Sequence, residues 1–282
     1  MLEAAEELGS DRVHGGSWMA RRAVEALADV AELPAESSGE LLERLRQAGR
    51  ELAESRRAMG AIAGAVGRVL AAAQSGAHLP ADELRRLVQS EAQGLVESRD
   101  RAARAIAIQL SDELRDAVVL THSASATVRE AVLHTPPERV VCTVSAPYEE
   151  GRAFSEELRG EGLAVDLVAD EDAASALERA SLLLIGADTV FRDGSVCNKI
   201  GTRDLAEAAA KLGVRTVVAC ELIKLAPVDP PDRIDEEETF DVTPAQYVDR
   251  IVTEEGAHPG DDIRALVDRT PFLAEGYALL SL

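Results

Sequence analysis

The chain has 282 residues and a formal net charge of −21, from 51 Asp and Glu against 30 Lys and Arg. Neutralisation of phosphates by basic side chains dominates affinity for nucleic acids, so this charge argues against a direct nucleic-acid partner. Only three of the 30 basic residues are lysine, and a surface this acidic and this rich in arginine is typical of a protein solvated in high salt.

The N-terminal stretch "MLEAAEELGSDRV" lacks the basic segment and apolar core of a signal peptide. No apolar run approaches the roughly 18 residues that a membrane helix needs. The three cysteines, Cys142, Cys197 and Cys220, lack the spacing of a metal site and fit a reducing compartment better than a disulfide framework. We therefore expect a soluble, cytoplasmic protein that does not contact a membrane.

Residues 1–112 are predicted to form a helical N-terminal domain. Apolar residues recur at spacings of three and four in "SWMARRAVEALADVAELP", "SGELLERLRQAGRELAESR" and "DELRRLVQSEAQGLVESRDRAARAIAIQL". No segment of this half has the pattern of a strand. The length of the chain also favours two domains.

Residues 113–282 are predicted to form a Rossmann-like α/β domain. Five short runs are apolar on both faces: "DAVVLTH", "RVVCTVS", "LAVDLVAD", "ASLLLIGAD" and "VRTVVACEL". They alternate with the helical segments "SATVREAVLH", "YEEGRAFSEELRG", "DEDAASALERA" and "TRDLAEAAAKLG". This alternation indicates buried parallel strands joined by crossover helices, and hence a doubly wound parallel sheet.

The C-terminal part of the chain carries two further predicted segments. Residues 227–241 are rich in Pro and acidic residues and are predicted to be a surface loop. Residues 242–259 are predicted to add a last helix and strand.

Ligands of open parallel sheets bind beyond the carboxyl ends of the strands. Three predicted loops lie there: "THSAS" after the first strand, "GAD" after the fourth and "CELIK" after the fifth. The glycine fingerprints of dinucleotide-binding and P-loop proteins are absent, so neither a nicotinamide nor a P-loop site has motif support.

Asn198 is the only asparagine of the chain, and it stands beside one of the few lysines, Lys199. Thr202 is predicted to cap the following helix and Gly213 to end it, so the segment gathers an amide, an ammonium group and helix-start N–H groups. Such a cluster suits a phosphate. Lys224 is predicted to lie on a second strand-end loop of the same sheet. For each position alone, an ordinary surface lysine or turn asparagine is the alternative.

Asp188 follows the most apolar predicted strand. Partial desolvation at the strand tip would raise the pKa of this carboxyl toward the range useful for acid–base chemistry. The alternative is a carboxylate that only caps the next turn.

The segments "GADTVFRDGSVCNKIGTRDLA", "CELIKLAP" and "FDVTPAQYVDRIVTEEG" resemble the C-terminal half of the alpha, beta and delta subunits of translation initiation factor 2B. That family includes methylthioribose-1-phosphate isomerase and ribose-1,5-bisphosphate isomerase. The resemblance extends from about Gly15 to the C-terminus and is strongest from Gly186 to Gly256. It implies a helical domain followed by a Rossmann-like domain, a homodimer or hexamer, and neither a cofactor nor a metal.

The resemblance also implies a binding site for a sugar phosphate and two catalytic positions. The implied binding residues are Gly15, Gly16, Ser17, Arg56, Ser125, Asn198, Lys199 and Lys224. Asp188 matches the family's catalytic aspartate, and Ser123 stands where the family's isomerases have a catalytic cysteine.

The replacement of that cysteine by Ser123 changes the chemistry, because a thiolate is accessible near neutral pH and an alkoxide is not. Ser123 would need a nearby base. The neighbouring His122 is predicted to be a loop or packing residue, since adjacent side chains usually point apart. Two further departures are His14, where an arginine commonly precedes the Gly-rich loop, and Arg57, where the family usually has proline.

Three functions remain open. The first is a non-catalytic regulatory protein that keeps the pocket as a sensor of a phosphorylated sugar or nucleotide, with translation initiation factor 2 subunits as partners. The second is a sugar-phosphate aldose–ketose isomerase of the ribose-1,5-bisphosphate type. Asp188 would be its acid and base, and Ser123 or a displaced thiol such as Cys197 would take the place of the cysteine. The third is a relative that has lost both ligand and activity. Ser123 favours the first.

Overall fold

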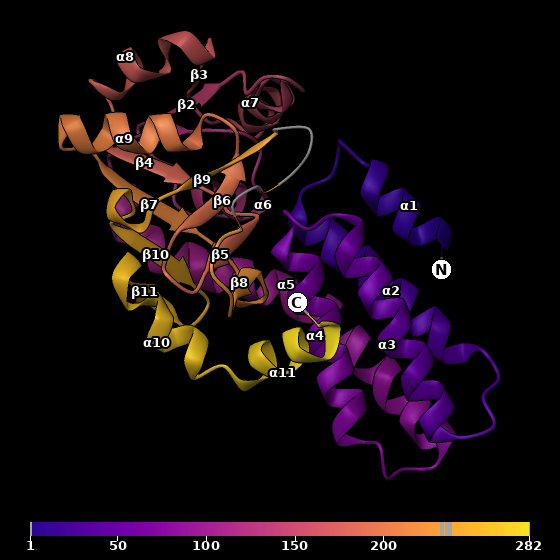
Figure 1. Ribbon diagram of the computed structural model, residues 1–282. Helices are drawn as coiled ribbons and strands as arrows, with labels where there is room; N and C mark the ends of the chain where they lie inside the picture. Colours follow the sequence, from indigo (N-terminus) through magenta and orange to yellow (C-terminus); the bar gives the residue numbers. More distant parts are fainter. Residues whose placement is uncertain (1, 232–233, 235–238, 282) are drawn as a thin grey trace. The chain divides into compact units, whose positions relative to one another are not determined.

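The computed structural model describes residues 2–231, 234 and 239–281. They form two compact units (Figure 1). The first unit comprises residues 2–99, 223–228 and 265–281, and the second unit comprises residues 100–222 with the described part of 229–264. The C-terminal segment therefore returns to the first unit. The boundary predicted at residue 112 falls inside the long helix α5 (Ala81–Leu114).

The first unit is built from helices, as the sequence predicts. Its elements are α1 (Leu2–Ser10), α2 (Gly16–Glu32), α3 (Ser38–Ser55), α4 (Gly60–Ser75), the start of α5, the short strand β8 (Leu225–Ala226), the end of α10 (Ile263–Asp268), and α11 (Pro271–Leu280). From residue 2 to residue 114 the structure contains helices and their connections and no strand. Within the described ranges, no helix combines the length and the apolar character needed to cross a membrane.

Helix α4 is buried along most of its length because small residues fill its sequence "GAIAGAVG". A Cβ atom at Gly64 would overlap the carbonyl oxygen of Ile223, and one at Gly67 would lie 2.9 Å from the Cα atom of Gly276 in α11. Backbones approach this closely only where a residue has no side chain. The contact with Ile223 holds the 3₁₀ turn η2 (Leu222–Lys224), which ends in Lys224.

A seven-stranded sheet forms the centre of the second unit. Its strands are β1 (Val118–Thr121), β2 (Arg139–Thr143), β3 (Val165–Val168), β4 (Leu182–Ile185), β7 (Arg215–Ala219), β10 (Arg250–Thr253) and β11 (Gly256–His258), in the order β11-β10-β7-β4-β1-β2-β3. All neighbours are parallel except β10 and β11. The strand order reverses between β1 and β4, so the loops after these two strands flank the topological switch point, where doubly wound sheets bind ligands.

The crossover helices of the second unit are α6 (Ala126–His134), α7 (Glu150–Gly160), α8 (Ala173–Leu177) and α9 (Thr202–Leu212). Residues of the central strands pack with α5, α6 and α7 in one apolar core that includes Leu110, Val119, Val132, Phe154 and Leu184. The runs that are apolar on both faces are therefore buried parallel strands, and the predicted fold class is confirmed.

The second unit also contains a small antiparallel sheet that the sequence did not indicate. The strands that this unit contributes are β5 (Thr189–Phe191), β6 (Val196–Lys199) and β9 (Phe240–Thr243), with β6 between the other two. Asn198 and Lys199 lie in β6 and pair with Asp241 and Phe240. The prediction that Lys199 lies on a loop at the end of a parallel strand is therefore wrong, whereas Lys224 does lie in a turn that follows β7.

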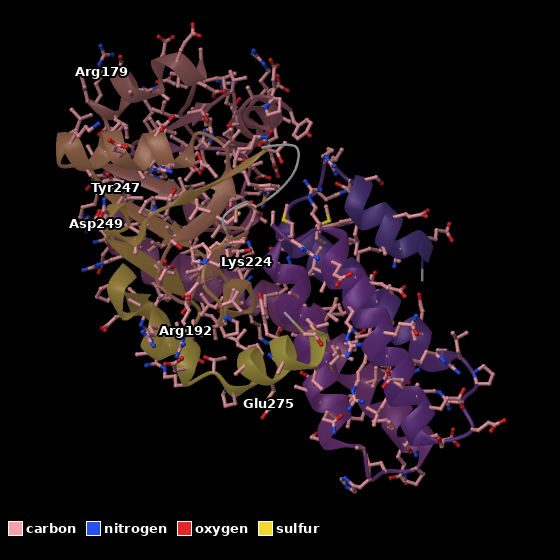
Figure 2. The ribbon with its side chains drawn as sticks, in the orientation of Figure 1. Arg179, Arg192, Lys224, Tyr247, Asp249 and Glu275 are labelled. Carbon is pink, nitrogen blue, oxygen red and sulfur yellow. The ribbon has the colours of Figure 1, made fainter. Side chains whose placement is uncertain are left out.

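The prediction of a helix within residues 242–259 is also wrong. Ala245–Tyr247 forms only the single 3₁₀ turn η3, and β10 and β11 follow as a hairpin. Residues Ile251 and Val252 are buried because β10 pairs with β7, and the Asp249 carboxylate accepts a hydrogen bond from the Thr216 N–H at 2.8 Å (Figure 2). Pairing at the sheet edge thus overrides the local helical pattern. The predicted loop 227–241 lies partly outside the described residues, and its end begins β9.

Candidate functional site

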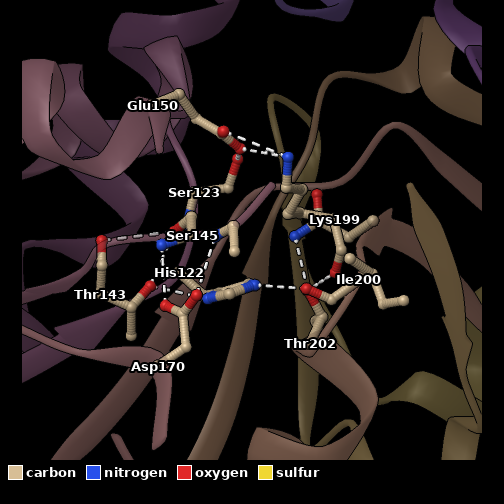
Figure 3. A network of polar contacts seen from close by, with 11 residues as sticks. His122, Ser123, Thr143, Ser145, Glu150, Asp170, Lys199, Ile200 and Thr202 are labelled. Carbon is tan, nitrogen blue, oxygen red and sulfur yellow. Dashed lines mark hydrogen bonds and ion pairs between the residues drawn. The ribbon is translucent and has the colours of Figure 1, made fainter. Parts of the chain in front are cut away.

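Ser123 lies in the loop after β1 and has a left-handed backbone, with φ of 65°. Non-glycine residues seldom adopt this conformation, so surrounding contacts must hold it. One such contact is a hydrogen bond of 2.8 Å from the Ser123 N–H to the Ser145 hydroxyl oxygen. The Ser123 hydroxyl in turn donates to the Glu150 carboxylate at 2.6 Å (Figure 3). The loop after β1 is thereby joined to the first residue of α7.

Lys199 shares this carboxylate. Its Nζ atom lies 3.1 Å from each oxygen of Glu150, and the Lys199 side chain is 6% exposed whereas that of Glu150 is 24% exposed. The ammonium group also lies 4.6 Å from the centre of the Tyr148 ring, within the range of a cation–π interaction. The lysine predicted to bind phosphate is thus a buried cation that the protein neutralises with its own carboxylate.

His122 points into the interior and away from the Ser123 hydroxyl (Figure 3). Its Nε2 atom lies 2.8 Å from the Ile200 carbonyl oxygen, and its Nδ1 atom lies 2.7 Å from the Thr143 hydroxyl. Burial lowers the pKa of His122, so the ring is neutral at pH 7. A carbonyl can only accept, so Nε2 carries the proton and Nδ1 accepts from Thr143. His122 is therefore a packing residue, as the sequence predicts, and is not the base for Ser123.

The loop after β2 is fixed by a second internal carboxylate. The backbone N–H groups of Ser145 and Ala146 each donate to Asp170 at 2.7 Å. The Ser145 hydroxyl, 2.7 Å from that of Thr143, connects this loop to the His122 network. The hydrogen-bonded chain from His122 to Ser145 thus supports the backbone conformation of Ser123.

The start of α9 differs from the prediction. Its N-cap residue is Gly201, with φ of 96°, and Asp241 of β9 accepts hydrogen bonds from the N–H groups of Gly201 and Arg203 at 2.7 and 3.2 Å. Thr202 donates to the Lys199 carbonyl at 2.6 Å and is therefore not the cap. Helix α9 ends at Gly213 in the left-handed conformation, as predicted.

Asn198 and Asp241 are partners across β6 and β9. The Asn198 amide donates to the Thr202 hydroxyl at 3.0 Å, so it orders the turn that follows Lys199. Burial raises the pKa of Asp241 to about 6, against the opposing effect of its backbone hydrogen bonds. The helix-start N–H groups expected to face a phosphate are therefore engaged by Asp241 within the fold.

The loops after β1 and β4 meet at the switch point. Ser125 caps α6 by accepting a hydrogen bond from the Val128 N–H at 3.3 Å, and a Cβ atom at Gly186 would lie 2.5 Å from its hydroxyl oxygen. Glycine is needed at this position of the "GAD" segment for the close approach. Asp188 is half-buried, and its N–H donates to the Cys197 carbonyl at 3.0 Å. The catalytic role of Asp188 stays a prediction.

All three cysteines are buried and free of disulfide bonds. Burial raises the pKa of Cys142 to about 12, and Cys197 is fully buried in β6. A thiol that is buried and protonated serves as a small apolar group.

The remaining predicted binding residues lie in the first unit. Gly15 is the N-cap of α2, and Gly16 and Ser17 are its first, buried residues. Asp11 accepts hydrogen bonds from the N–H and ring of His14, which stacks on Trp18 at 3.9 Å. The Arg56 side chain donates to the Asp11 carbonyl.

Lys224 also belongs to the first unit, and it is 4% exposed at the end of η2 (Figure 2). Gly16, Ser17 and Lys224 are buried, Arg56 is half-buried and Gly15 is exposed. Their part in ligand binding stays a prediction.

The sequence analysis missed Glu150, Tyr148 and Asp241. Tyr148 and Glu150 lie at the start of the segment predicted as the second crossover helix, after a strand. Residues that follow the carboxyl end of a parallel strand are candidates for a binding site. Among 51 acidic residues this position does not single out one carboxylate. Only the return of β6 to the switch point brings Lys199 to Glu150.

The chain matches a protein-family model and is similar in sequence to proteins from other organisms. The model of the Initiation factor 2 subunit family matches residues 12–239. A ribose 1,5-bisphosphate isomerase from Haloterrigena turkmenica is 30% identical over 95% of this chain and 92% of its own length.

Two solved structures share the fold. The Pyrococcus horikoshii translation initiation factor eIF-2B superposes with a TM-score of 0.78 at 27% identity and covers 92% of this chain and 96% of its own. A chain of the tetrameric eIF2B-beta2-delta2 complex from C. thermophilum superposes with a TM-score of 0.82 at 22% identity and covers 95% and 93%.

Proposed function

The chain belongs to the Initiation factor 2 subunit family, and on that premise we propose that it is a non-catalytic regulatory protein that binds a phosphorylated sugar or nucleotide. Its relatives include proteins named as initiation factor and proteins named as isomerase. The choice between these two functions therefore depends on the chemistry of the site.

The contacts of Glu150 with Ser123 and with Lys199 carry the proposal. Lys199 is a buried cation at the switch point, and its partner Glu150 is partly exposed, so the site can present a positive charge to an anion. A hydroxyl stands where the family's isomerases have a thiol, and all three cysteines of the chain are buried. The site thus keeps the means to bind a phosphate without an accessible thiolate.

The other predicted binding residues follow from the family. Gly15, Gly16, Ser17, Arg56 and Lys224 would bind the same ligand, together with Ser125 and Asn198. Translation initiation factor 2 subunits would be the protein partners, and the protein would act as a homodimer or hexamer in the cytoplasm.

One observation favours the isomerase as the second candidate. The Glu150 carboxylate is 2.6 Å from the Ser123 hydroxyl and is within reach to accept its proton. In that case Ser123 and Asp188 would move protons between the anomeric carbon and its neighbour.

Incubation with ribose 1,5-bisphosphate tests the choice directly. We expect calorimetry in molar salt to detect binding, and an assay for ribulose 1,5-bisphosphate to detect no product. Conversion that depends on Ser123 would establish the isomerase instead. Absence of both binding and conversion would contradict both functions.

A further inference from the structure

The pair formed by Glu150 and Lys199 differs from the contacts of two other internal carboxylates, those of Asp170 and Asp241. Asp170 and Asp241 accept hydrogen bonds from backbone N–H groups, which form part of the fold. Both hydrogen-bond partners of Glu150 are side-chain groups, the Ser123 hydroxyl and the Lys199 ammonium group. These are groups that a phosphate oxygen would also engage.

The two partners of this ion pair are not equally exposed. The Lys199 side chain is 6% exposed and lies under the Tyr148 ring, whereas the Glu150 side chain is 24% exposed at the first turn of α7. A buried ammonium group without a counter-ion is costly, so Lys199 requires an anion at all times. Of the two groups, Glu150 has the greater access to water.

The charges at the site make simultaneous occupancy unfavourable. With Glu150 in place, the net charge of the Glu150–Lys199 pair is zero. The oxygens of an incoming phosphate would then have to occupy the positions beside Lys199 that the carboxylate oxygens already hold. Like charges at such short range repel strongly, most of all where water is partly excluded.

We propose that Glu150 is a built-in competitor for the phosphate of the ligand. It occupies Lys199 and Ser123 in the unliganded protein, and a phosphate binds there by displacing it. This inference rests on the proposed function, because it assigns regulation to the same pocket. Competition by Glu150 weakens the apparent affinity for phosphate. The apparent affinity equals the affinity of the site without Glu150 multiplied by the fraction of molecules in which Glu150 has left the site.

The substitution Glu150→Gln tests the proposal with the full chain. Glutamine keeps the size of the side chain and can still accept the hydrogen bond from Ser123, but it removes the negative charge. We expect the Kd of inorganic phosphate, measured by titration at fixed pH and ionic strength, to fall at least about tenfold, with a similar change for ribose 1,5-bisphosphate.

A matched control is available on the preceding residue. The Glu149 carboxylate pairs with Arg152 at 2.7 Å, and both side chains are 53% exposed. Glu149→Gln therefore removes the same charge from the same turn without touching Lys199, and its Kd should stay within about twofold of wild type. Adding Lys199→Met to Glu150→Gln should abolish the gain.

A measurement on the wild-type protein does not depend on any variant folding. Carbodiimide-driven coupling of an amine to carboxylates, read by mass spectrometry, should label Glu150 more strongly when inorganic phosphate is bound and leave the labelling of Glu149 unchanged.

Glu150→Ala provides a second variant without the carboxylate, and it should also bind phosphate more tightly than wild type.

The outcomes separate this proposal from the function on which it rests. If wild type binds phosphate and neither Glu150→Gln nor Glu150→Ala binds it more tightly, competition by Glu150 is rejected and the pocket remains. If wild type and both variants fail to bind inorganic phosphate and ribose 1,5-bisphosphate at millimolar concentration, the phosphate pocket itself is rejected.

Discussion

The Ser123 hydroxyl donates a hydrogen bond of 2.6 Å to the Glu150 carboxylate. This contact engages the hydroxyl that we predict to stand in place of a catalytic thiol. It connects the two chemical features of the site, a weak nucleophile and a carboxylate that already pairs with Lys199.

Restoring the thiol with Ser123→Cys should create isomerase activity if Asp188 and the phosphate-binding residues remain in place. Proton transfer by a positioned group contributes roughly a hundredfold to ten-thousandfold to rate. Because a neighbouring carboxylate disfavours a thiolate, Ser123→Cys with Glu150→Gln should be faster than Ser123→Cys alone. The measurement is the rate of ribulose 1,5-bisphosphate formation, with Ser123→Ala as control. Wild type turning over as fast as Ser123→Cys would make the protein an isomerase that needs no thiol, and turnover in neither, despite measurable ligand binding, would support the regulatory function.

The charge state of Asp241 should make stability depend on pH. Burial raises the pKa of Asp241 from its ordinary 3.8 to about 6, so the folded state binds a proton more tightly than the unfolded state. Stability is therefore greatest below about pH 4 for this group and is lost as pH rises to about 6, by on the order of 2–3 kcal/mol.

The comparison with Asp241→Asn isolates this effect, because the amide does not titrate. Unfolding by urea should show the wild type losing stability relative to the variant between about pH 4 and pH 6, and a constant difference above that range. Two curves that stay parallel across the range would exclude a raised pKa for Asp241.

Gly64→Ala should destabilise the first unit by about 3 kcal/mol, because the new methyl group would overlap the backbone of Ile223. The matched control is Gly94→Ala in α5, where a Cβ meets no atom within 4 Å. That change should stabilise the protein by roughly 0.5–1 kcal/mol, since alanine favours helix over glycine. Denaturant unfolding of both variants measures the difference, and a similar effect for the two would contradict the packing described for α4.

Salt should stabilise the protein. A net charge of −21 makes the folded chain repel itself, and molar salt shortens the screening length to about 3 Å. We expect the thermal midpoint to rise between 0.1 M and 3 M KCl by more than in a neutral osmolyte of equal osmolality. A midpoint that does not respond to KCl would reject adaptation to high salt.

The protein should sediment as a closed homo-oligomer in molar salt, at a multiple of the 30.0 kDa chain. Analytical ultracentrifugation across a range of protein concentrations measures the mass, and a single 30.0 kDa species at all concentrations would contradict the prediction.

The arrangement of strands and helices was largely predictable from sequence because it depends on local periodicity. The runs ending at Thr121, Thr143 and Ile185 are apolar on both faces, and such runs are stable only when buried between layers of helices. The strands β5, β6 and β9 were missed because three or four residues carry too little pattern, and the pairing of β6 with β9 joins segments more than 40 residues apart.

The residues of the candidate site also fall into those that the sequence pointed to and those that only the tertiary structure revealed. Sequence pointed to Lys199 through the scarcity of lysine, and to Ser123 through the resemblance to the family. It did not identify Glu150 as their partner, and it assigned the cap of α9 to Thr202 when Asp241 performs that function. With 51 acidic residues, local sequence cannot show which carboxylate meets which donor. The tertiary fold decides this, since a buried cation must find an anion and only the packing of β6 beside the start of α7 determines which one is within reach.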